Sequence, residues 1–242
     1  MAVKAVITSI EKTGSSDVED MFSLHSLYYD NISKRKFSED LSLKQWAILL
    51  RTESGALSGF STLQLISLDV GGTPHRFLFS GNTVVEEGSR MSHALAGSFG
   101  HVMMMLLDRY GEKNIHWFLI SKGFRSYRFL PVFFKRFYPR FDQITPEISV
   151  KLISAVSVAK FGRKYDCEKN IIRMRGETDW LKSEHAIIPP GRLNDPHVAF
   201  FISANPGYKA GDELACLADI NCSNLNENAR RVIKSTKVDW DV

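Results

Sequence analysis

The sequence predicts a mixed α/β (α+β) fold, in which one mostly antiparallel central sheet is flanked by helices. Three observations support this prediction. Apolar stretches of strand length alternate with stretches of helical spacing over the first 140 residues. Turn residues such as Gly71 and Gly72 join consecutive strands into a meander. A long amphipathic helix then connects two apolar strands, as in a strand-helix-strand crossover.

The N-terminal part is expected to contain a strand, two helices and the meander. Residues 3–10 carry the apolar and β-branched side chains of a strand. A helix capped by Ser15 or Ser16 and a shorter helix capped by Ser33 should follow. The meander consists of three antiparallel strands separated by turn residues, at residues 46–50, 57–70 and 76–85.

A long helix and a second apolar strand form the middle of the chain. Residues 90–110 have apolar side chains at helical spacing, and Gly111 stands where a left-handed C-cap is preferred. Residues 115–120 predict a central strand that is apolar on both faces apart from His116. Residues 124–137 predict a further helix, which Pro131 must kink or restart because proline has no amide proton.

The character of the chain changes after about Thr145. Residues 161–196 are loop-rich and could form an insertion that lies over a binding cleft. Around this segment the pattern predicts an amphipathic helix, two closing strands and a last helix, at residues 146–161, 197–203, 213–220 and 228–235. We expect residues 1–140 to form the core, and residues 141–242 to form an extension packed on the same domain.

The composition of the chain is that of an ordinary soluble globular protein. Its 242 residues are 44% hydrophobic and 24% charged. No stretch stays apolar for the roughly 18 residues that a membrane span requires. The N-terminus lacks the apolar core and the cleavage site of a signal peptide. These features predict a cytoplasmic location.

Several kinds of site are not expected. The three cysteines form no CxxC pair and the seven histidines show no HxH or HxxxH spacing, so we predict no structural metal. The net charge of +4 suits a small anionic ligand but, without a recognisable motif, does not indicate nucleic acid. The chain has no GxSxG elbow, no Walker loop and no GxGxxG after a strand.

The junction between the third meander strand and the long helix is a candidate anion site. The amides of a helix's first turn lack intrahelical partners, and the positive end of the helix dipole lies there. Arg90 could add a positive charge, and the hydroxyls of Ser89 and Ser92 could donate to an oxyanion. Alternatively, these serines could simply cap the helix.

The element order and residues 77–138 resemble the Gcn5-related N-acetyltransferase (GNAT) superfamily. The resemblance covers residues 3–138, and the loop-rich segment delays the closing strands. In this family the fourth strand splays from the fifth, and the acyl-thioester arm of coenzyme A lies in the gap. Its pyrophosphate binds a loop of pattern Q/R-x-x-G-x-G/A. Residues 89–94, SRMSHA, are a degenerate version of this loop, with serine at its first and fourth positions.

The resemblance implies a coenzyme A-type donor and names the residues that would bind it. The donor would be acetyl-CoA or a longer acyl-CoA, or an acyl group carried by an acyl carrier protein. The binding residues would lie at the end of the fourth strand, in the loop and in the helix after the fifth strand. They are Val84, Val85, Ser89, Arg90, Met91, Ser92, His93, Ala94, Arg125 and Arg128.

The resemblance also implies a catalytic acid and a catalytic base. An amine must lose a proton before it attacks the thioester carbonyl, and the leaving thiolate must regain one. Glu86 corresponds to the family's carboxylate base, and Tyr127 to its acid. Other interpretations stay open: Glu86 and Glu87 could only form a favourable contact with the helix dipole, and Tyr127 could be a buried aromatic.

Residues 122–140 are rich in basic and aromatic residues and contain no acidic residue. Three interpretations of this segment are open. Its basic side could contact the phosphates of coenzyme A or an acidic acyl carrier protein. It could instead lie on an anionic membrane surface as an amphipathic helix. It could also be a core helix whose arginines face water.

The leading functional prediction is an N-acyltransferase that moves an acetyl or longer acyl group from a thioester directly to an amine. The alternative is a catalytically inactive protein of the same fold that acts by binding or regulation. The expected partners are an amine or another small-molecule substrate, with acyl carrier protein as an option for the donor. No nucleic acid is expected as a partner.

Overall fold

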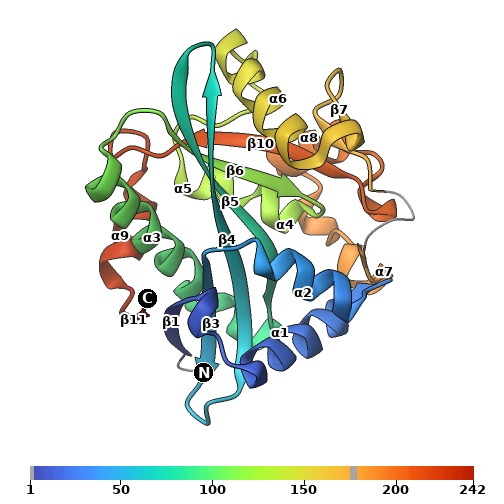
Figure 1. The fold of residues 1–242 in the computed structure, drawn as a ribbon. Coiled ribbons are helices and arrows are strands. Elements are labelled where there is room, and N and C mark those ends of the chain that lie inside the picture. Colours follow the sequence, from blue (N-terminus) through green and yellow to red (C-terminus); the bar gives the residue numbers. More distant parts are fainter. Residues whose placement is uncertain (1–2, 175–178) are drawn as a thin grey trace.

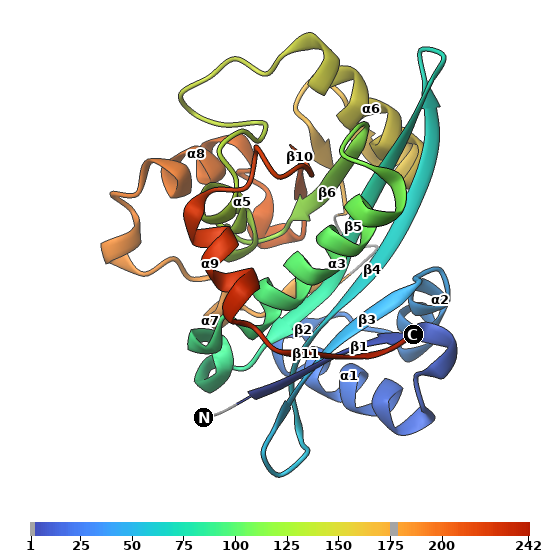
Figure 2. The same cartoon turned by 90° about the vertical axis from the view of Figure 1, so that its left-hand side faces the viewer.

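The protein contains a nine-stranded mixed sheet with helices on both faces (Figures 1 and 2). The computed structural model describes residues 3–174 and 179–242, and the side chains of residues 90–92 lie outside what it describes. The strand order is β11-β1-β3-β4-β5-β6-β10-β8-β7. Among these strands, β1 with β11 and β5 with β6 pair in parallel, and the other neighbours pair antiparallel. The predicted mixed, mostly antiparallel sheet is confirmed.

The strands of the main sheet differ greatly in length. They are β1 (Val3–Ser9), β3 (Trp46–Thr52), β4 (Leu57–Val70), β5 (Thr73–Val85), β6 (Ile115–Ser121), β7 (Tyr165–Asp166), β8 (Ile171–Ile172), β10 (Glu213–Asp219) and β11 (Val238–Asp241). A separate two-stranded sheet joins β2 (Tyr29–Asp30) to β9 (Trp180–Leu181). The short strands β7, β8 and β9 fall in the segment that was predicted to be loop-rich.

Helices cover the two faces of the sheet in separate groups. They are α1 (Ser15–Tyr28), α2 (Lys34–Ser42), α3 (Ala94–Tyr110), α4 (Phe124–Tyr127), α5 (Phe129–Phe133), α6 (Glu147–Phe161), α7 (Ser183–Ala186), α8 (Pro196–Ala204) and α9 (Glu227–Ser235). Helices α1, α2 and α6 lie on one face, and α3, α4, α5, α8 and α9 on the other (Figure 2). Within the described ranges, no helix is long and apolar enough to cross a membrane.

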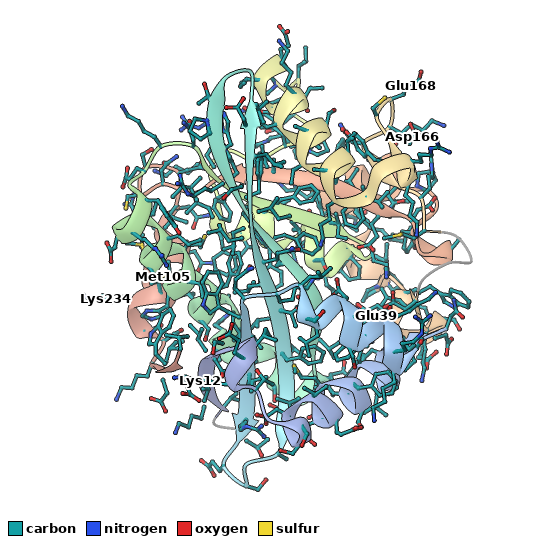
Figure 3. All side chains as sticks on the ribbon, viewed as in Figure 1. Lys12, Glu39, Met105, Asp166, Glu168 and Lys234 are labelled. Atoms are coloured by element: carbon teal, nitrogen blue, oxygen red, sulfur yellow. The ribbon has the colours of Figure 1, made fainter. Side chains whose placement is uncertain are left out.

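The core follows from the two-residue period of the strands. On β5, Phe77 and Phe79 pack with Ile153 of α6, whereas Leu78 between them packs with the α3 side. A third cluster joins α1 and α2 to the same face as α6, through residues such as Phe60 of β4. Side chains fill the space between sheet and helices, and charged residues such as Glu39 lie at the periphery (Figure 3).

A β-bulge in β5 separates that strand from β6. Thr62 of β4 pairs with Gly81, but Phe60, two residues earlier, pairs with Val84, so β5 carries one extra residue. Asn82 in the bulge has a φ of 46°, which asparagine tolerates better than most residues. The parallel pairing of β5 with β6 ends at Ser80 opposite Leu119, directly before the bulge. Beyond that point the two strands continue without pairing, which leaves a gap between them.

The predicted strand at residues 197–203 is wrong, because this stretch lies in helix α8. The carboxylate of Asp195 accepts a hydrogen bond from the amide of His197 at 3.0 Å, and Pro196 occupies the first turn. An aspartate cap followed by proline is a strong helix start, and here it prevails over the apolar run behind it. The closing pair of strands is therefore reduced to β10, which lies between β6 and β8.

Two predicted helices have different bounds in the structure. The long helix begins at Ala94 and not at residue 90, because His93 has a left-handed φ of 53° and residues 87–92 form a 3-10 helix. The helix predicted over residues 124–137 is two short helices, α4 and α5, that end at Phe133. Pro131 falls in the first turn of α5, where its missing amide proton costs nothing. Strand β11, parallel to β1, was not predicted.

Two glycines allow α9 to approach α3 closely. A Cβ atom at Gly97 would lie 1.9 Å from Thr236 Oγ1, and one at Gly100 would lie 2.2 Å from Ile233 Cγ1. Both distances are far shorter than a van der Waals contact, so the two helices can pack at this separation only without side chains there. This contact holds the C-terminal helix against the helix that follows the β5 junction.

We expect Gly100→Ala to lower the free energy of unfolding by about 1–3 kcal/mol, because it overpacks this contact. In the double variant with Ile233→Ala the two effects should not add. That change removes Cγ1 and Cδ1 and leaves Ile233 Cβ at 3.4 Å, an ordinary contact. The measurement is chemical denaturation of the two single variants and the double variant. Gly191→Ala is the matched control, because there is open space around Gly191. Strictly additive effects of Gly100→Ala and Ile233→Ala would contradict the close contact.

Candidate functional site

A cavity of about 290 Å³ lies at the gap between β5 and β6. One wall is the end of β5, from Thr83 to Val85, and another is the start of α3, from His93 to Leu95. The segment that follows β6 and parts of β9 and α7 close it on the other side. We call it the first cavity. A strand end, a helix N-terminus and a gap in the sheet therefore meet at one place, as the predicted junction requires.

A second cavity of about 360 Å³ adjoins the first. It is lined by α1, α2, the bulge of β5, the end of β6 and the C-terminal end of α6. Tyr29, Thr83 and Ser126 line both cavities, so the two spaces meet at the gap between the strands. The segment predicted to be an insertion contributes to each, for example Asp179 to the second cavity and His185 to the first.

Six of the ten predicted cofactor residues line the first cavity. They are Val84, Val85, Ser89, His93, Ala94 and Arg125. The backbone of Arg90, Met91 and Ser92 belongs to the 3-10 helix, but their side chains lie outside the described part of the structure. These three assignments therefore stay predictions. The tenth residue, Arg128, is not in the lining of either cavity as described.

The N-terminus of α3 faces the first cavity. His93 has a left-handed backbone and its carbonyl accepts the first helical hydrogen bond, from the Gly97 amide at 2.9 Å. Ser98 donates to the Ala94 carbonyl within the same turn. Because the positive end of the helix dipole lies here, an anionic group in the cavity would be favoured.

The predicted basic segment does not form one amphipathic helix. It is divided over the turn after β6, helices α4 and α5, and a loop, and several of its cations have partners within the chain. Arg125 donates to the His185 carbonyl at 3.1 Å, Arg128 forms an ion pair with Asp195 at 3.0 Å, and Arg140 pairs with Asp142. Of these three arginines, only Arg125 lines the first cavity.

The two predicted catalytic residues lie outside the described lining of both cavities. Tyr127 is fully buried and its hydroxyl donates to the Pro139 carbonyl at 2.9 Å. Burial raises the pKa of this phenol, which makes it a weaker acid. Glu86 precedes the 3-10 helix; its amide donates to Ser58 and its carbonyl accepts from the Ser89 amide. Their catalytic roles stay predictions.

A buried charge cluster that sequence reasoning missed lines the second cavity. The ammonium of Lys122 lies 3.0 Å from Asp179 Oδ1 and 3.5 Å from Glu213 Oε1, and it also donates to the Asp179 carbonyl. Lys122 and Asp179 are 57 residues apart, so no motif spacing could reveal the contact. The only sequence signal is that a lysine directly follows a strand that is apolar on both faces.

The cluster members have shifted pKa values. Burial alone would lower the pKa of Lys122, but the carboxylates of Glu213 and Asp179 outweigh it and raise that pKa. Burial opposes ionisation of Asp179 too, yet Lys122 and His25 hold its pKa well below the usual range. Burial raises the pKa of Glu213, and Lys122 offsets this only in part. Glu213 is therefore the carboxylate of this cluster that takes up a proton most readily.

His25 completes the cluster from helix α1. Its Nε2 lies 3.3 Å from Asp179 Oδ2, and its ring stacks on Tyr29 with centroids 4.3 Å apart. Its Nδ1 is buried and has no hydrogen-bond partner among the described residues. A histidine oriented by a carboxylate can accept a proton from a reacting group that reaches its other nitrogen. The same described residues contain no group of three or more His, Cys, Asp or Glu arranged to hold a metal ion.

We expect Lys122→Met to lower the free energy of unfolding by about 3–5 kcal/mol, because it leaves the buried Glu213 and the partly buried Asp179 without their shared cation. The matched control is Lys4→Met, which breaks an exposed ion pair with Asp239 and should cost no more than about 1 kcal/mol. Chemical denaturation at neutral pH measures both. Equal effects of the two variants would show that the cluster is not a buried charge network.

No protein-family model matches the chain, and no curated protein matches it. Among solved structures, it is similar to a protein of unknown function from Enterococcus faecalis V583 that is described as a probable N-acyltransferase. The identity is 10%, the match covers 89% of this chain and 64% of that chain, and the TM-score is 0.44.

Two further solved structures are similar over about half of the chain. One is a GNAT family N-acetyltransferase from Escherichia coli in complex with CoA, with 16% identity, 50% of this chain and 65% of that chain covered, and a TM-score of 0.33. The other is the Saccharomyces cerevisiae N-myristoyltransferase with bound myristoyl-CoA, with 17% identity, 50% and 29% covered, and a TM-score of 0.37. The chain spans less than two thirds of the length of each of these three structures.

Proposed function

We propose that the protein is an N-acyltransferase of the GNAT type. It binds an acyl thioester in the first cavity and an amine in the second, and the acyl group passes between them at the gap between β5 and β6. The observation that carries the proposal is the place where the two cavities meet. Tyr29, Thr83 and Ser126 line both, directly after the point where the two parallel strands stop pairing.

The first cavity fits a donor of the coenzyme A type. The pairing of β5 with β6 ends at Ser80, so the amide-containing arm of a donor can lie along this edge of β5 and form hydrogen bonds with its backbone. Phosphate groups suit the N-terminus of α3, with Arg125 as the nearby cation that lines the cavity. When bound, such a donor supplies the acyl group as an activated thioester. Either coenzyme A or an acyl carrier protein can present it.

The transfer itself requires two proton movements. The amine nitrogen forms a bond to the acyl carbon while the carbon–sulfur bond breaks, so the amine loses a proton and the thiolate gains one. Two groups can take the proton from the amine. The family resemblance suggests Glu86 as the proton acceptor. The position of His25 suggests this residue instead, since it lines the second cavity and is in contact with Asp179.

Donor binding is tested by thermal unfolding with CoA, acetyl-CoA, a long-chain acyl-CoA and an acylated carrier protein. A species present at ~100 times its Kd should raise the Tm by about 5–10 °C, because it stabilises the folded state by about 2.7 kcal/mol. Arg125→Ala should reduce the shift, whereas Arg136→Ala, at an exposed position, should not. No shift with any of the four species would overturn the proposal. Binding without transfer to any amine would favour the alternative, an inactive binding protein.

The base is tested with His25→Gln and Glu86→Gln, assayed for acyl transfer to an amine that the wild-type protein accepts. Because His25 lines the amine cavity, we expect His25→Gln to lower kcat by about 10²-fold or more, and to change the pH–rate profile. Glu86→Gln should stay within a few-fold of wild type. The opposite result would assign the base to Glu86.

A further inference from the structure

The second cavity contains a lysine without a carboxylate partner. Lys160, at the C-terminal end of α6, is half-buried and lines the cavity. Its ammonium donates to Gln64 Oε1 at 2.7 Å and lies 4.3 Å from the centroid of the Phe79 ring. No carboxylate in the described residues lies within 4.0 Å of it. A partly buried cation is normally matched by an anion, so this one is left with weak compensation.

The carboxylate that could serve Lys160 is already engaged. Asp40 of α2 lines the same cavity, but its Oδ1 accepts from Lys44 at 2.8 Å and its Oδ2 from Asn82 at 2.7 Å. Lys44 is fully buried in its side chain and brings a second positive charge to this side of the cavity. As a result, burial and the nearby Lys44 lower the pKa of Lys160 to about 8.

The acidic cluster gives another part of the same cavity the opposite charge. One lysine, Lys122, is set against two carboxylates, Asp179 and Glu213, so the three groups carry one excess negative charge when all are ionised. This excess favours a cation in the cavity, such as an ammonium group. Lys122 directly follows β6, whereas Lys160 is on α6, so the two charges belong to different elements of the cavity wall.

We propose that the second cavity binds a small amine that also carries an anionic group, a carboxylate or a phosphate. Lys160 holds the anionic group, and the Lys122–Asp179–Glu213 cluster attracts the ammonium group. This names the acceptor class of the proposed acyltransferase and therefore rests on that function. The ligand supplies the counter-ion that Lys160 does not find among the described residues, and Lys160 is the residue that sets specificity for it.

The test begins with binding to the full chain in the absence of any thioester. β-Alanine, O-phosphoethanolamine and the neutral-tailed ethylamine are titrated at constant ionic strength, with calorimetry or thermal unfolding as the readout. We expect one or both anionic amines to bind and ethylamine to bind at least about tenfold more weakly, the loss typical of a charge-assisted hydrogen bond. Comparing the first two amines distinguishes a carboxylate from a phosphate.

Two variants and the pH identify the residue responsible. Lys160→Met should abolish the preference for the anionic amines, whereas Lys151→Met, on the outer side of the same helix, should keep it. The preference should be present below pH 8 and should fade as the pH rises through about 8, because the Lys160 ammonium then loses its proton. Equal binding of all three amines by wild-type protein, or an unchanged preference in Lys160→Met, would overturn the proposal. The wild-type comparison holds even if the variant does not fold.

Acyl transfer then separates this inference from the proposed function. If anionic amines bind through Lys160 but no thioester reacts with them, the site stands and the acyltransferase function fails. If thioesters react with amines and the KM values show no preference for anionic ones, the function stands and the acceptor class is wrong. In an active enzyme of the proposed class, Lys160→Met should raise KM for the anionic acceptor by about tenfold, whereas Lys151→Met should leave that KM unchanged.

Discussion

The extra residue in β5 is the constraint on which the rest of the site depends. The bulge at Asn82 ends the pairing of β5 with β6, although both strands continue. Two neighbouring strand ends then lack a common ladder. Both cavities lie at this gap, and helix α3 begins a few residues beyond the end of β5. A single local irregularity thus sets the position of a strand edge, a helix N-terminus and two cavities.

The two cavities differ in the charged groups that line them. The first is largely apolar, with a helix N-terminus and Arg125 as its positive features, which suits an anionic donor with an apolar acyl group. The second is lined by charges of both signs, which come from α2, α6, β10, the turn after β6 and the segment before β9. Buried charges are costly unless they are matched. Lys122 is paired with carboxylates, whereas the partners of Lys160 among the described residues are an amide oxygen and two aromatic rings.

Local pattern predicted the fold well and failed where capping or long-range pairing prevailed. The meander, the long helix and the central strand were found because they follow periodicity. The apolar run of residues 197–203 fits a strand or a buried helix, and the cap formed by Asp195 makes it a helix. Strand β11 was missed because its strand structure depends on pairing with β1, at the other end of the chain. Five of the predicted cofactor residues line the first cavity because they belong to the junction of β5 and α3, and Arg125 reaches it from α4.

The sequence by itself determined the strand-turn-helix junction, because neighbouring residues set caps, turns and helix ends. Only the tertiary structure decided which charges meet at the second cavity. His25, Lys122 and Asp179 come from α1, the end of β6 and the segment before β9, and no spacing links them. Their contacts exist because the helices of one face and the insertion close over the same gap. The folded chain decides whether a charged side chain has a partner, and the residues next to it in the sequence do not.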